Sequence, residues 1–413
     1  MMQKIANAIA NLASEQDPQA PLCAYIYDLE QLKNHASAMM AALPSNCELY
    51  YAAKANPEAE VLQVLAPIVD GVEAASGGEL NWIHQCQPQV PLIFGGPGKL
   101  VSELSQAIDL NVDAIHVESL TELQRITALC IQKQRHCRIL LRMNISLEGI
   151  AETRLTMGGK PTPFGIDACE LDTAITMVRD IPTVAGNPLV ELIGFHFHLM
   201  SHQLDAERHL ALMKLYFSTF KNWCQKYSLN LPMLNVGGGV GVNYSDPQQV
   251  FDWACFCTEL GTLIKQNQME AVNIRFECGR FVTAAMGYYV MQVLDIKKNH
   301  GQWFAIGHGG THHFRTPAAQ AHDHPFFVLA AKDIGIELEQ AETKITTANL
   351  KSELVTMVGQ LCTPKDVLAT QQYVEQLAVG DYLVFSHAGA YAWNISHQNF
   401  LMHAPPQRFF IRE

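Results

Sequence analysis

Short apolar runs alternate with segments of helical periodicity between residues 48 and 280. Between the runs, apolar side chains recur every three or four positions, as at Leu120, Leu123, Ile126 and Leu129, which is typical of one buried helix face. Strand–helix alternation predicts a parallel sheet, and eight such units in about 230 residues predict a (β/α)8 barrel. A doubly wound sheet is the alternative. The expected strands are Leu49–Ala55, Val72–Ala75, Leu92–Gly95, Ala114–Val117, Ile139–Ile145, Leu192–Leu199, Met233–Val236 and Ile274–Cys278.

The pattern changes after about residue 285. Strand-like runs now follow one another with only turn residues between them, which predicts a mostly antiparallel β domain. We therefore expect a barrel over residues 30–282 and a β domain formed by residues 1–29 and 283–413. The expected strands of this domain are Tyr288–Ile296, Trp303–Ile306, Phe326–Ala330, Leu354–Val358, Tyr382–Ser386 and Arg408–Ile411.

Composition narrows the possible functions. Among 413 residues, 28 Lys and Arg stand against 40 Asp and Glu, and no basic run reaches five residues, so a nucleic-acid partner is not expected. No apolar run approaches the roughly 18 residues needed to span a bilayer, and Met1–Pro18 does not resemble a signal peptide. The 11 scattered cysteines favour the reducing cytoplasm. We expect a cytoplasmic protein that acts on a small molecule.

Lys54 is the first candidate for chemistry. It lies in the first apolar run, where a buried amine would have a lowered pKa and could form a Schiff base. The alternative is a lysine that extends from the end of the strand into solvent.

Two later turns could bind an anion and a ring nitrogen. Gly237–Gly239 follow a predicted strand, and successive glycines let backbone N–H groups approach a phosphate, although they also form ordinary tight turns. Glu277 and Arg280 flank Gly279 after the last barrel strand. A carboxylate there could keep a pyridine nitrogen protonated, and an arginine could bind phosphate. A surface ion pair is the alternative.

Further candidates are two histidines, a thiol and a tyrosine. His196 and His198 could face the same way, but no third ligand follows at zinc spacing, so a flat imidazole over a cofactor ring or a core role is preferred and no metal is expected. Cys362 lies between Gly359 and Asp366, and Tyr391 follows a glycine turn. Each is unremarkable alone.

Together these segments resemble the fold-type III pyridoxal-phosphate decarboxylases, the family of the diaminopimelate, ornithine and arginine enzymes, which have an alanine racemase-like barrel. The match covers nearly the whole chain, with nine landmarks in family order. They are Tyr51–Asn56, Ser76–Leu80, Val117–Ser119, Phe164–Ile166, Phe195–His198, Gly237–Gly239, Glu277–Arg280, Gly359–Cys362 and Gly389–Tyr391.

The resemblance implies a role for each matching residue. Lys54 would bind pyridoxal 5'-phosphate covalently, and Glu277 would keep its ring nitrogen charged. Cys362 would return a proton to the substrate carbon and, with Asp366, would reach the active site of the neighbouring subunit, which implies a homodimer. His198 would stack on the ring, and the phosphate would be held by residues at the turns, namely Ser201, Gly238, Gly239, Gly279, Arg280 and Tyr391.

Departures from the diaminopimelate enzymes bear on the substrate. Those enzymes carry Glu-Ser after the cysteine, whereas Thr363–Lys365 follow Cys362 here, which replaces a carboxylate with a potential cation. Gly309–Arg315 add His312, His313 and Arg315 where the family binds the far end of the substrate. With Ser396–Phe400, this is closer to the siderophore-pathway decarboxylases that act on citryl-diaminopropionate. The alternative is that these histidines lie at the surface or an interface.

The sequence thus predicts a decarboxylase for an L-amino acid with an anionic tail, whose substrate is bound by Arg315, His312, His313, Lys365 and Asp366. A decarboxylase of diaminopimelate or another basic amino acid is one alternative. A racemase or a non-catalytic homologue is another, although the joint presence of Lys54, Glu277 and Cys362 disfavours the latter.

Overall fold

The computed structural model describes the chain except for residues 1, 16–19, 147–157, 185, 337–348 and 413. The described chain forms two compact units. One contains Lys33–Val242 and Val250–Val282, and the other contains Met1–Leu32, Asn243–Gln249 and Thr283–Glu413. We refer to them as the barrel unit and the β unit.

Eight parallel strands close into a barrel in the first unit. Sequential strands pair with one another, β12 pairs with β2, and β6 pairs with β10, so the sheet has no open edge. The predicted (β/α)8 barrel is confirmed. The strands are β2 (Cys47–Ala52), β3 (Gly71–Ala74), β4 (Leu92–Phe94), β5 (Ala114–Val117), β6 (Cys137–Asn144), β10 (Val190–His196), β11 (Met233–Gly237) and β12 (Asn273–Cys278). Short strands accompany them, namely β7 (Ile166–Asp167), which pairs with β6, and the hairpin of β8 (Thr183–Val184) and β9 (Asn187–Pro188).

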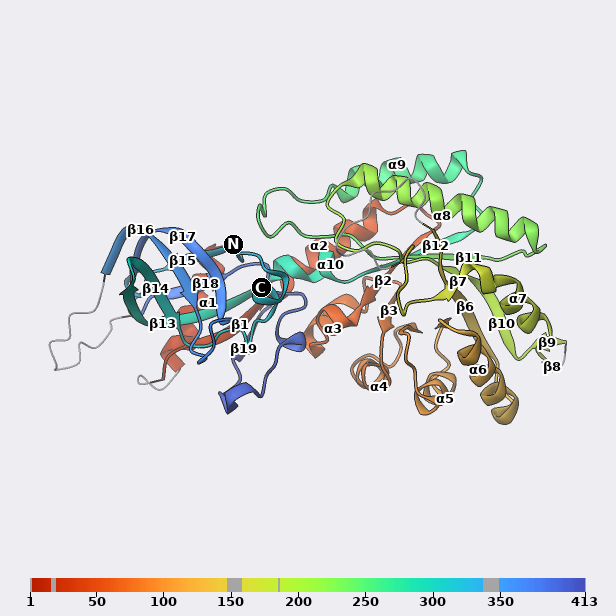
Figure 1. The fold of residues 1–413 in the computed structure, drawn as a ribbon, viewed down its shortest axis with the longest axis horizontal. Coiled ribbons are helices and arrows are strands. Elements are labelled where there is room, and N and C mark those ends of the chain that lie inside the picture. Colours follow the sequence, from red (N-terminus) through yellow and green to blue (C-terminus); the bar gives the residue numbers. More distant parts are fainter. Residues whose placement is uncertain (1, 16–19, 147–157, 185, 337–348, 413) are drawn as a thin grey trace. The chain divides into compact units, whose positions relative to one another are not determined.

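Helices surround these strands (Figure 1). They are α2 (Leu29–Ala42), α3 (Ala59–Leu65), α4 (Gly77–Cys86), α5 (Val101–Asp109), α6 (Leu120–Lys133), α7 (Leu171–Arg179), α8 (Ala206–Lys226) and α9 (Trp253–Gln266), followed by the short α10 (Arg280–Thr283).

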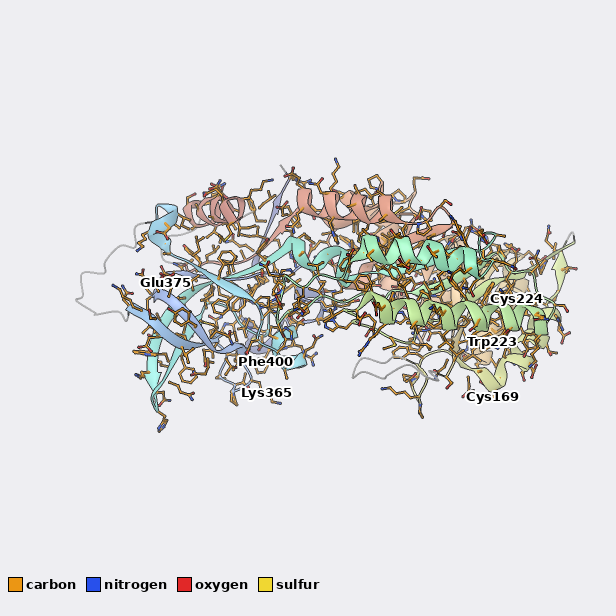
Figure 2. The ribbon with its side chains drawn as sticks, turned by 90° about the horizontal axis from the view of Figure 1, so that it is seen from above. Cys169, Trp223, Cys224, Lys365, Glu375 and Phe400 are labelled. Carbon is orange, nitrogen blue, oxygen red and sulfur yellow. The ribbon has the colours of Figure 1, made fainter. Side chains whose placement is uncertain are left out.

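Helix α8 illustrates how the sequence sets this arrangement. The Asp205 carboxylate caps its first turn by accepting from the N–H groups of Glu207 and Arg208. Its buried side chains recur every three or four residues, so one face of the helix covers the barrel. Trp223, labelled in Figure 2, meets Phe195 edge-on with ring centroids 5.2 Å apart. Burial of aromatic rings of this kind stabilises the fold by about 2–3 kcal/mol each.

The β unit contains an eight-stranded sheet that is mostly antiparallel, as predicted. Its order is β15-β18-β13-β14-β16-β17, with β1 paired to β13 and β19 paired to β1. Only β14–β16 and β1–β19 are parallel among the described pairs. The strands are β1 (Cys23–Asp28), β13 (Gly287–Asn299), β14 (Gln302–Gly307), β15 (Phe326–Leu329), β16 (Asn349–Val358), β17 (Val367–Ala378), β18 (Tyr382–Phe385) and β19 (Gln407–Ile411).

Two helices belong to this unit, α1 (Met2–Glu15) and α11 (Thr316–Gln320). Ile5 and Ile9 on α1 pack into the same apolar core as Ile26 of β1 and Val290 of β13. The sequence did not predict β17, because its polar residues interrupt the apolar pattern that marks the other strands. None of the described helices is long and apolar enough to cross a membrane.

Candidate active site

The interior of the barrel changes from apolar to polar toward the carboxyl ends of the strands. Ala114, Leu140 and Met233 belong to one buried cluster with Tyr50, Ile93 and Ile193. Residues two positions apart in a strand share a face. The next inward positions are therefore His116, Arg142 and Asn235, all of them buried. This polar layer lies at the end of a (β/α)8 barrel where active sites form.

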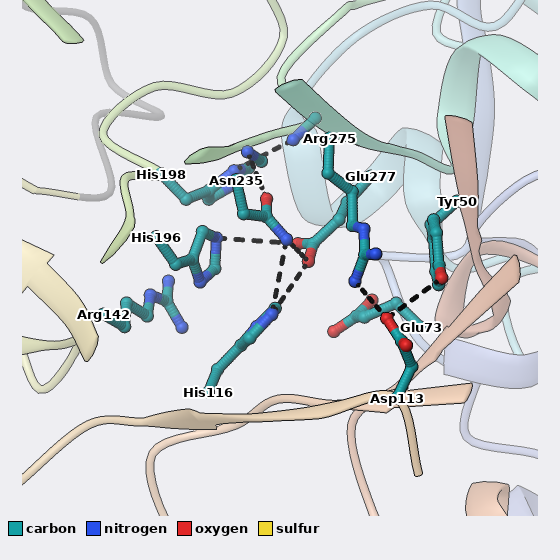
Figure 3. A network of polar contacts seen from close by, with 12 residues as sticks. Tyr50, Glu73, Asp113, His116, Arg142, His196, His198, Asn235, Arg275 and Glu277 are labelled. Carbon is teal, nitrogen blue, oxygen red and sulfur yellow. Dashed lines mark hydrogen bonds and ion pairs between the residues drawn. The ribbon is translucent and has the colours of Figure 1, made fainter. Parts of the chain in front are cut away.

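Glu277 is at the centre of this polar layer, at the end of β12 (Figure 3). One carboxylate oxygen, Oε1, accepts a hydrogen bond from Asn235 Nδ2 at 2.7 Å and lies 3.5 Å from His116 Nε2. The other, Oε2, lies 3.6 Å from His196 Nε2. Burial, followed by the charge of Glu73, raises the pKa of Glu277 from 4.5 to about 7. The site therefore favours a positively charged group beside this carboxyl.

Both imidazoles next to Glu277 are uncharged. Burial is the main cause that lowers the pKa of His116 and of His196 well below 6.5, and nearby cationic groups lower them further. Both ring nitrogens of His196 are buried without a hydrogen-bond partner, as is Nδ1 of His116. The sequence indicated no third ligand for the H-x-H pair, but the fold places ligand atoms of His116, His196 and Glu277 within 4.8 Å of one another, which could hold a metal ion.

Lys54 does not lie within a strand, contrary to the sequence-based expectation. Strand β2 ends at Ala52, and Lys54 occupies the following turn, Ala53–Ala55, with its side chain 45% exposed. Its Nζ atom lies 3.0 Å from Oε2 of the buried Glu73 on β3. The turn thus places an amine at the carboxyl end of the barrel, where a ligand can reach it.

The glycine turn after β11 can be formed only by glycine. Gly237 and Gly239 have φ values of +66° and +93°. A Cβ atom at Gly238 would lie 2.1 Å from the carbonyl oxygen of Glu277, and one at Gly237 would lie 2.0 Å from His198 Nδ1. The Gly238 N–H donates to that His198 nitrogen at 3.2 Å, which fixes the ring beside the turn. The absence of side chains lets an anion approach this backbone closely, although the N–H groups of Gly237 and Gly238 already donate within the protein.

The remaining residues of the barrel unit that are predicted to bind the cofactor lie just after the ends of β10 and β12. Ser201 comes after β10, and Arg280, which is half-buried, begins α10 after β12. Gly279 lets β12 approach the Lys54 turn, because a Cβ atom there would lie 2.9 Å from Cβ of Ala55. Ser76, in contrast, caps α4, because its hydroxyl oxygen accepts a hydrogen bond from the backbone N–H of Glu79.

These residues fit pyridoxal phosphate. The cofactor needs an amine for its aldehyde, a carboxylate for its ring nitrogen and backbone N–H groups for its phosphate. Lys54, Glu277 and the turn at Gly237–Gly239 offer these groups at the carboxyl ends of β2, β12 and β11. The buried carboxyl beside the turn is the most specific of these groups, because a cationic ring nitrogen would stabilise its ionised form.

The β unit carries Cys362, Asp366 and Tyr391. Cys362 is an exposed free thiol on the loop between β16 and β17. Asp366 is buried, and its Oδ1 accepts from the backbone N–H of Thr311 at 2.6 Å, while Oδ2 accepts from the Leu361 N–H at 2.8 Å. Asp366 therefore holds the Cys362 loop against the loop that contains Thr311. Tyr391 has a φ of +50° in the turn after Gly389.

Arg315 and Lys365 line one cavity of about 1110 Å³ in the β unit, together with His397 and Phe400. Figure 2 shows Lys365 and Phe400 on this part of the unit. Arg315 and Lys365 are exposed cations, and Thr311 and Thr363 add hydroxyl groups to the lining. Such a surface is suited to a ligand with carboxylates.

His312 and His313 are not among the residues that line this cavity. Both are buried, and burial lowers the pKa of His312 to about 4 and that of His313 to about 3. The His313 ring is held by Tyr289 and by the carbonyl of Ala404. The His312 ring lies 3.8 Å from it, centroid to centroid. Their direct part in substrate binding stays a prediction.

Sequence reasoning did not single out Glu73, His116 or Asn235. Each is a polar residue inside a run that was otherwise read as a buried strand. A buried polar side chain needs a partner, so a polar residue in such a run is a signal that could have identified all three. Which partners they have depends on strands that are far apart in the sequence.

Comparisons with known proteins agree with this geometry. Residues 29–284 match the family described as "pyridoxal-dependent decarboxylase, pyridoxal binding domain". The chain is 42% identical over 393 residues to the 2-[(L-alanin-3-ylcarbamoyl)methyl]-2-hydroxybutanedioate decarboxylase of Staphylococcus aureus, covering 95% of both chains. It is 28% identical to the L-glutamyl-[BtrI acyl-carrier protein] decarboxylase of Niallia circulans, covering 92% of this chain and 87% of that protein.

Solved structures share the fold. A diaminopimelate decarboxylase from Helicobacter pylori superposes with a TM-score of 0.76 at 24% identity, covering 95% of this chain and 91% of that one. The arginine decarboxylase of Paramecium bursaria Chlorella virus gives a TM-score of 0.76 at 18% identity, covering 98% of this chain and 100% of that one.

Proposed function

Because the chain belongs to the family of pyridoxal-dependent decarboxylases, we propose that its substrate is an L-amino acid with an anionic, citryl-like tail. The enzyme is a carboxy-lyase that uses pyridoxal 5'-phosphate. The observation that carries the substrate proposal is the pair of exposed cations, Arg315 and Lys365, in the cavity of the β unit. A substrate with a second ammonium group would be repelled there, whereas carboxylates would be bound.

The staphylococcal relative supports this assignment. The substrate in the name of that relative consists of an alanine head joined through an amide to a hydroxybutanedioate, which is the amide of citrate with 2,3-diaminopropionate. Such a molecule carries two free carboxylates at the end away from the amino acid. Arg315 offers the forked donor geometry that matches a carboxylate, and Lys365 offers a point charge.

The barrel unit would hold the cofactor. When bound, pyridoxal phosphate supplies an aldehyde for the substrate amine and a ring that accepts electrons as CO2 leaves. Lys54 would bind the cofactor through its amine, and Glu277 would hold a proton at the ring nitrogen. His198 would lie against the ring, fixed by the N–H of Gly238.

The other groups would bind phosphate and move a proton. Ser201, Arg280 and Tyr391 would join the turn at Gly237–Gly239 in holding the phosphate. Cys362 would deliver a proton to the carbon that loses CO2, because it is an exposed thiol on a loop that Asp366 fixes.

We further infer a cytoplasmic homodimer in which Cys362 and Asp366 serve the partner's site. The eleven free thiols suit a reducing compartment, and sedimentation of the cofactor-loaded protein would give the subunit number. A monomer with full turnover would contradict the proposal that each active site is shared between two subunits.

Turnover of defined substrates tests the substrate proposal. The protein is incubated with citryl-2,3-diaminopropionate, meso-diaminopimelate and L-ornithine, CO2 is measured, and the amine product is identified by mass. Arg315→Ala and Lys365→Ala should each raise KM for the citryl substrate by about 10- to 100-fold, because each removes one charge-assisted contact. Lys332→Ala is the matched control, since Lys332 lines a separate cavity of the same unit.

The outcomes separate the alternatives. Efficient CO2 release from diaminopimelate alone would overturn the anionic-tail proposal. Stereoinversion without CO2 would indicate a racemase. Equal effects of Lys332→Ala and the two cavity variants would show that the cavity does not bind the tail.

A further inference from the structure

Asn235 is fully buried in the middle of β11, and its side chain contacts three polar groups. Its Oδ1 accepts from the N–H of Gly237 at 2.9 Å. Its Nδ2 donates to Oε1 of Glu277 at 2.7 Å and lies 3.3 Å from Nε2 of His116. One side chain thus joins the glycine turn to the carboxyl that faces a ring nitrogen.

The amide orientation of Asn235 follows from its neighbours. An N–H group can only donate, so the Gly237 N–H requires the oxygen of Asn235 and turns the NH2 group toward Glu277. The second hydrogen of that NH2 group faces His116, whose Nε2 must then accept. The proton of the neutral His116 ring is consequently on Nδ1, which has no described partner.

The strand register supports this arrangement of hydrogen bonds around Asn235. Asn235 pairs with Arg275 of β12, and the pairing of β11 with β12 shifts between Asn235 and Gly237. This irregularity brings the glycine turn against β12, where Gly238 approaches the carbonyl oxygen of Glu277. The position needs an acceptor on one side and two donors on the other, which an amide provides and a carboxylate does not.

We propose that Asn235 is a positioning residue that couples the phosphate-binding turn to Glu277 and keeps that carboxyl oriented toward the cofactor ring. The inference rests on the cofactor assignment but not on the substrate proposal. It goes beyond the roles of Lys54, Glu277 and the glycine turn, because Asn235 acts through its neighbours.

Asn235→Asp is the informative change, since it keeps the shape and replaces the donor by an acceptor. A second carboxylate would then face Glu277, and two carboxylates this close cannot both be ionised. The other charged and titratable groups around Glu277 are Lys54, Glu73, His116, Arg142 and His196. Comparison with the wild type at each pH isolates the effect of residue 235.

Binding of pyridoxal phosphate to the cofactor-stripped protein is the first measurement. At pH 8, Asn235→Asp should weaken binding by about 10- to 100-fold, and the difference should shrink toward pH 6 as the carboxyl pair takes up a proton. Asn46→Asp is the matched control, because the Asn46 amide donates only to the backbone carbonyls of Met269 and Val272. It should bind the cofactor as the wild type does.

Thermal unfolding of the stripped protein is the second measurement and does not depend on the cofactor. Asn235→Asp should lower the Tm, and Glu277→Gln in the same chain should restore it, because the amide and the carboxylate then exchange places. The restored protein should still bind the cofactor weakly, since no carboxylate is left at position 277.

Two results would overturn the proposal. One is cofactor affinity of Asn235→Asp equal to that of the wild type at pH 8. The other is a double variant with no higher Tm than Asn235→Asp alone, which would mean that residues 235 and 277 are not coupled. If the protein did not bind pyridoxal phosphate at all, the cofactor assignment would fail instead, while the Tm comparison would still test the coupling.

Discussion

The ammonium group of Lys54 lies 3.0 Å from a carboxylate oxygen of Glu73, although Glu73 is almost completely buried and Lys54 is not. The pair joins the turn after β2 to the middle of β3. It also supplies the negative charge that, after burial, contributes most to raising the pKa of Glu277. The amine that would bind the cofactor and the carboxyl that would hold its ring nitrogen are thus linked electrostatically through Glu73.

Lys54→Ala should abolish covalent cofactor attachment and destabilise the stripped protein. Without Lys54, the buried Glu73 carboxylate loses the ammonium group that it contacts, and this costs about 1–2 kcal/mol after allowance for the exposure of Lys54. Lys54→Ala/Glu73→Gln should recover that loss. Denaturant unfolding measures the stability, and mass after borohydride reduction measures attachment. Retained attachment in Lys54→Ala would refute the assignment.

Glu277 should make the stripped protein less stable as the pH rises. Its folded pKa of about 7 lies above the ordinary value of 4.5. The stabilising contribution is therefore complete below about pH 4.5 and is lost as the pH rises to about 7, by roughly 3 kcal/mol in total. Unfolding free energies measured across this range should show the slope in the wild type. Glu277→Gln should lack this component, and identical slopes would contradict the raised pKa.

Cys362→Ala should impair proton delivery without affecting cofactor binding. The loss of a positioned proton donor is expected to lower kcat by about 10²- to 10⁴-fold. Product formed in D2O should lose stereochemical purity at the carbon that carried the carboxylate, as NMR would show. Cys169→Ala is the control, because Cys169 is an exposed thiol of the barrel unit. Normal turnover of Cys362→Ala would remove the proposed role.

Asp366→Asn should destabilise the β unit and loosen the Cys362 loop. Either orientation of the new amide places an NH2 group opposite a backbone N–H, of Thr311 or of Leu361. The expected loss is about 2–4 kcal/mol by denaturant unfolding. Asp323→Asn should lose about 1 kcal/mol or less, because Asp323 is exposed. Equal losses in both variants would show that the burial of Asp366 is unimportant.

Periodicity was sufficient for the barrel strands. Each apolar run falls on a strand of the closed sheet, because buried parallel strands require continuous apolar sequence. Periodicity was insufficient for β17 (Val367–Ala378). This strand lies at the edge of the sheet, where it pairs with β16, and its sequence mixes polar and apolar side chains. Periodicity also placed Lys54 within a strand, since Ala53 and Ala55 are as apolar as the residues before them.

By itself the sequence indicated the reaction class through its resemblance to a known family, because an amine at 54, glycines at 237–239 and an acid at 277 occur among nine landmarks in family order. Only the tertiary structure decided which side chains contact Glu277 and Lys54. Asn235, His116 and Glu73 come from three strands, and closure of the sheet is what brings them to Glu277 and Lys54. It also decided that His312 is buried and Arg315 exposed, three residues apart, because burial depends on what packs against each side chain.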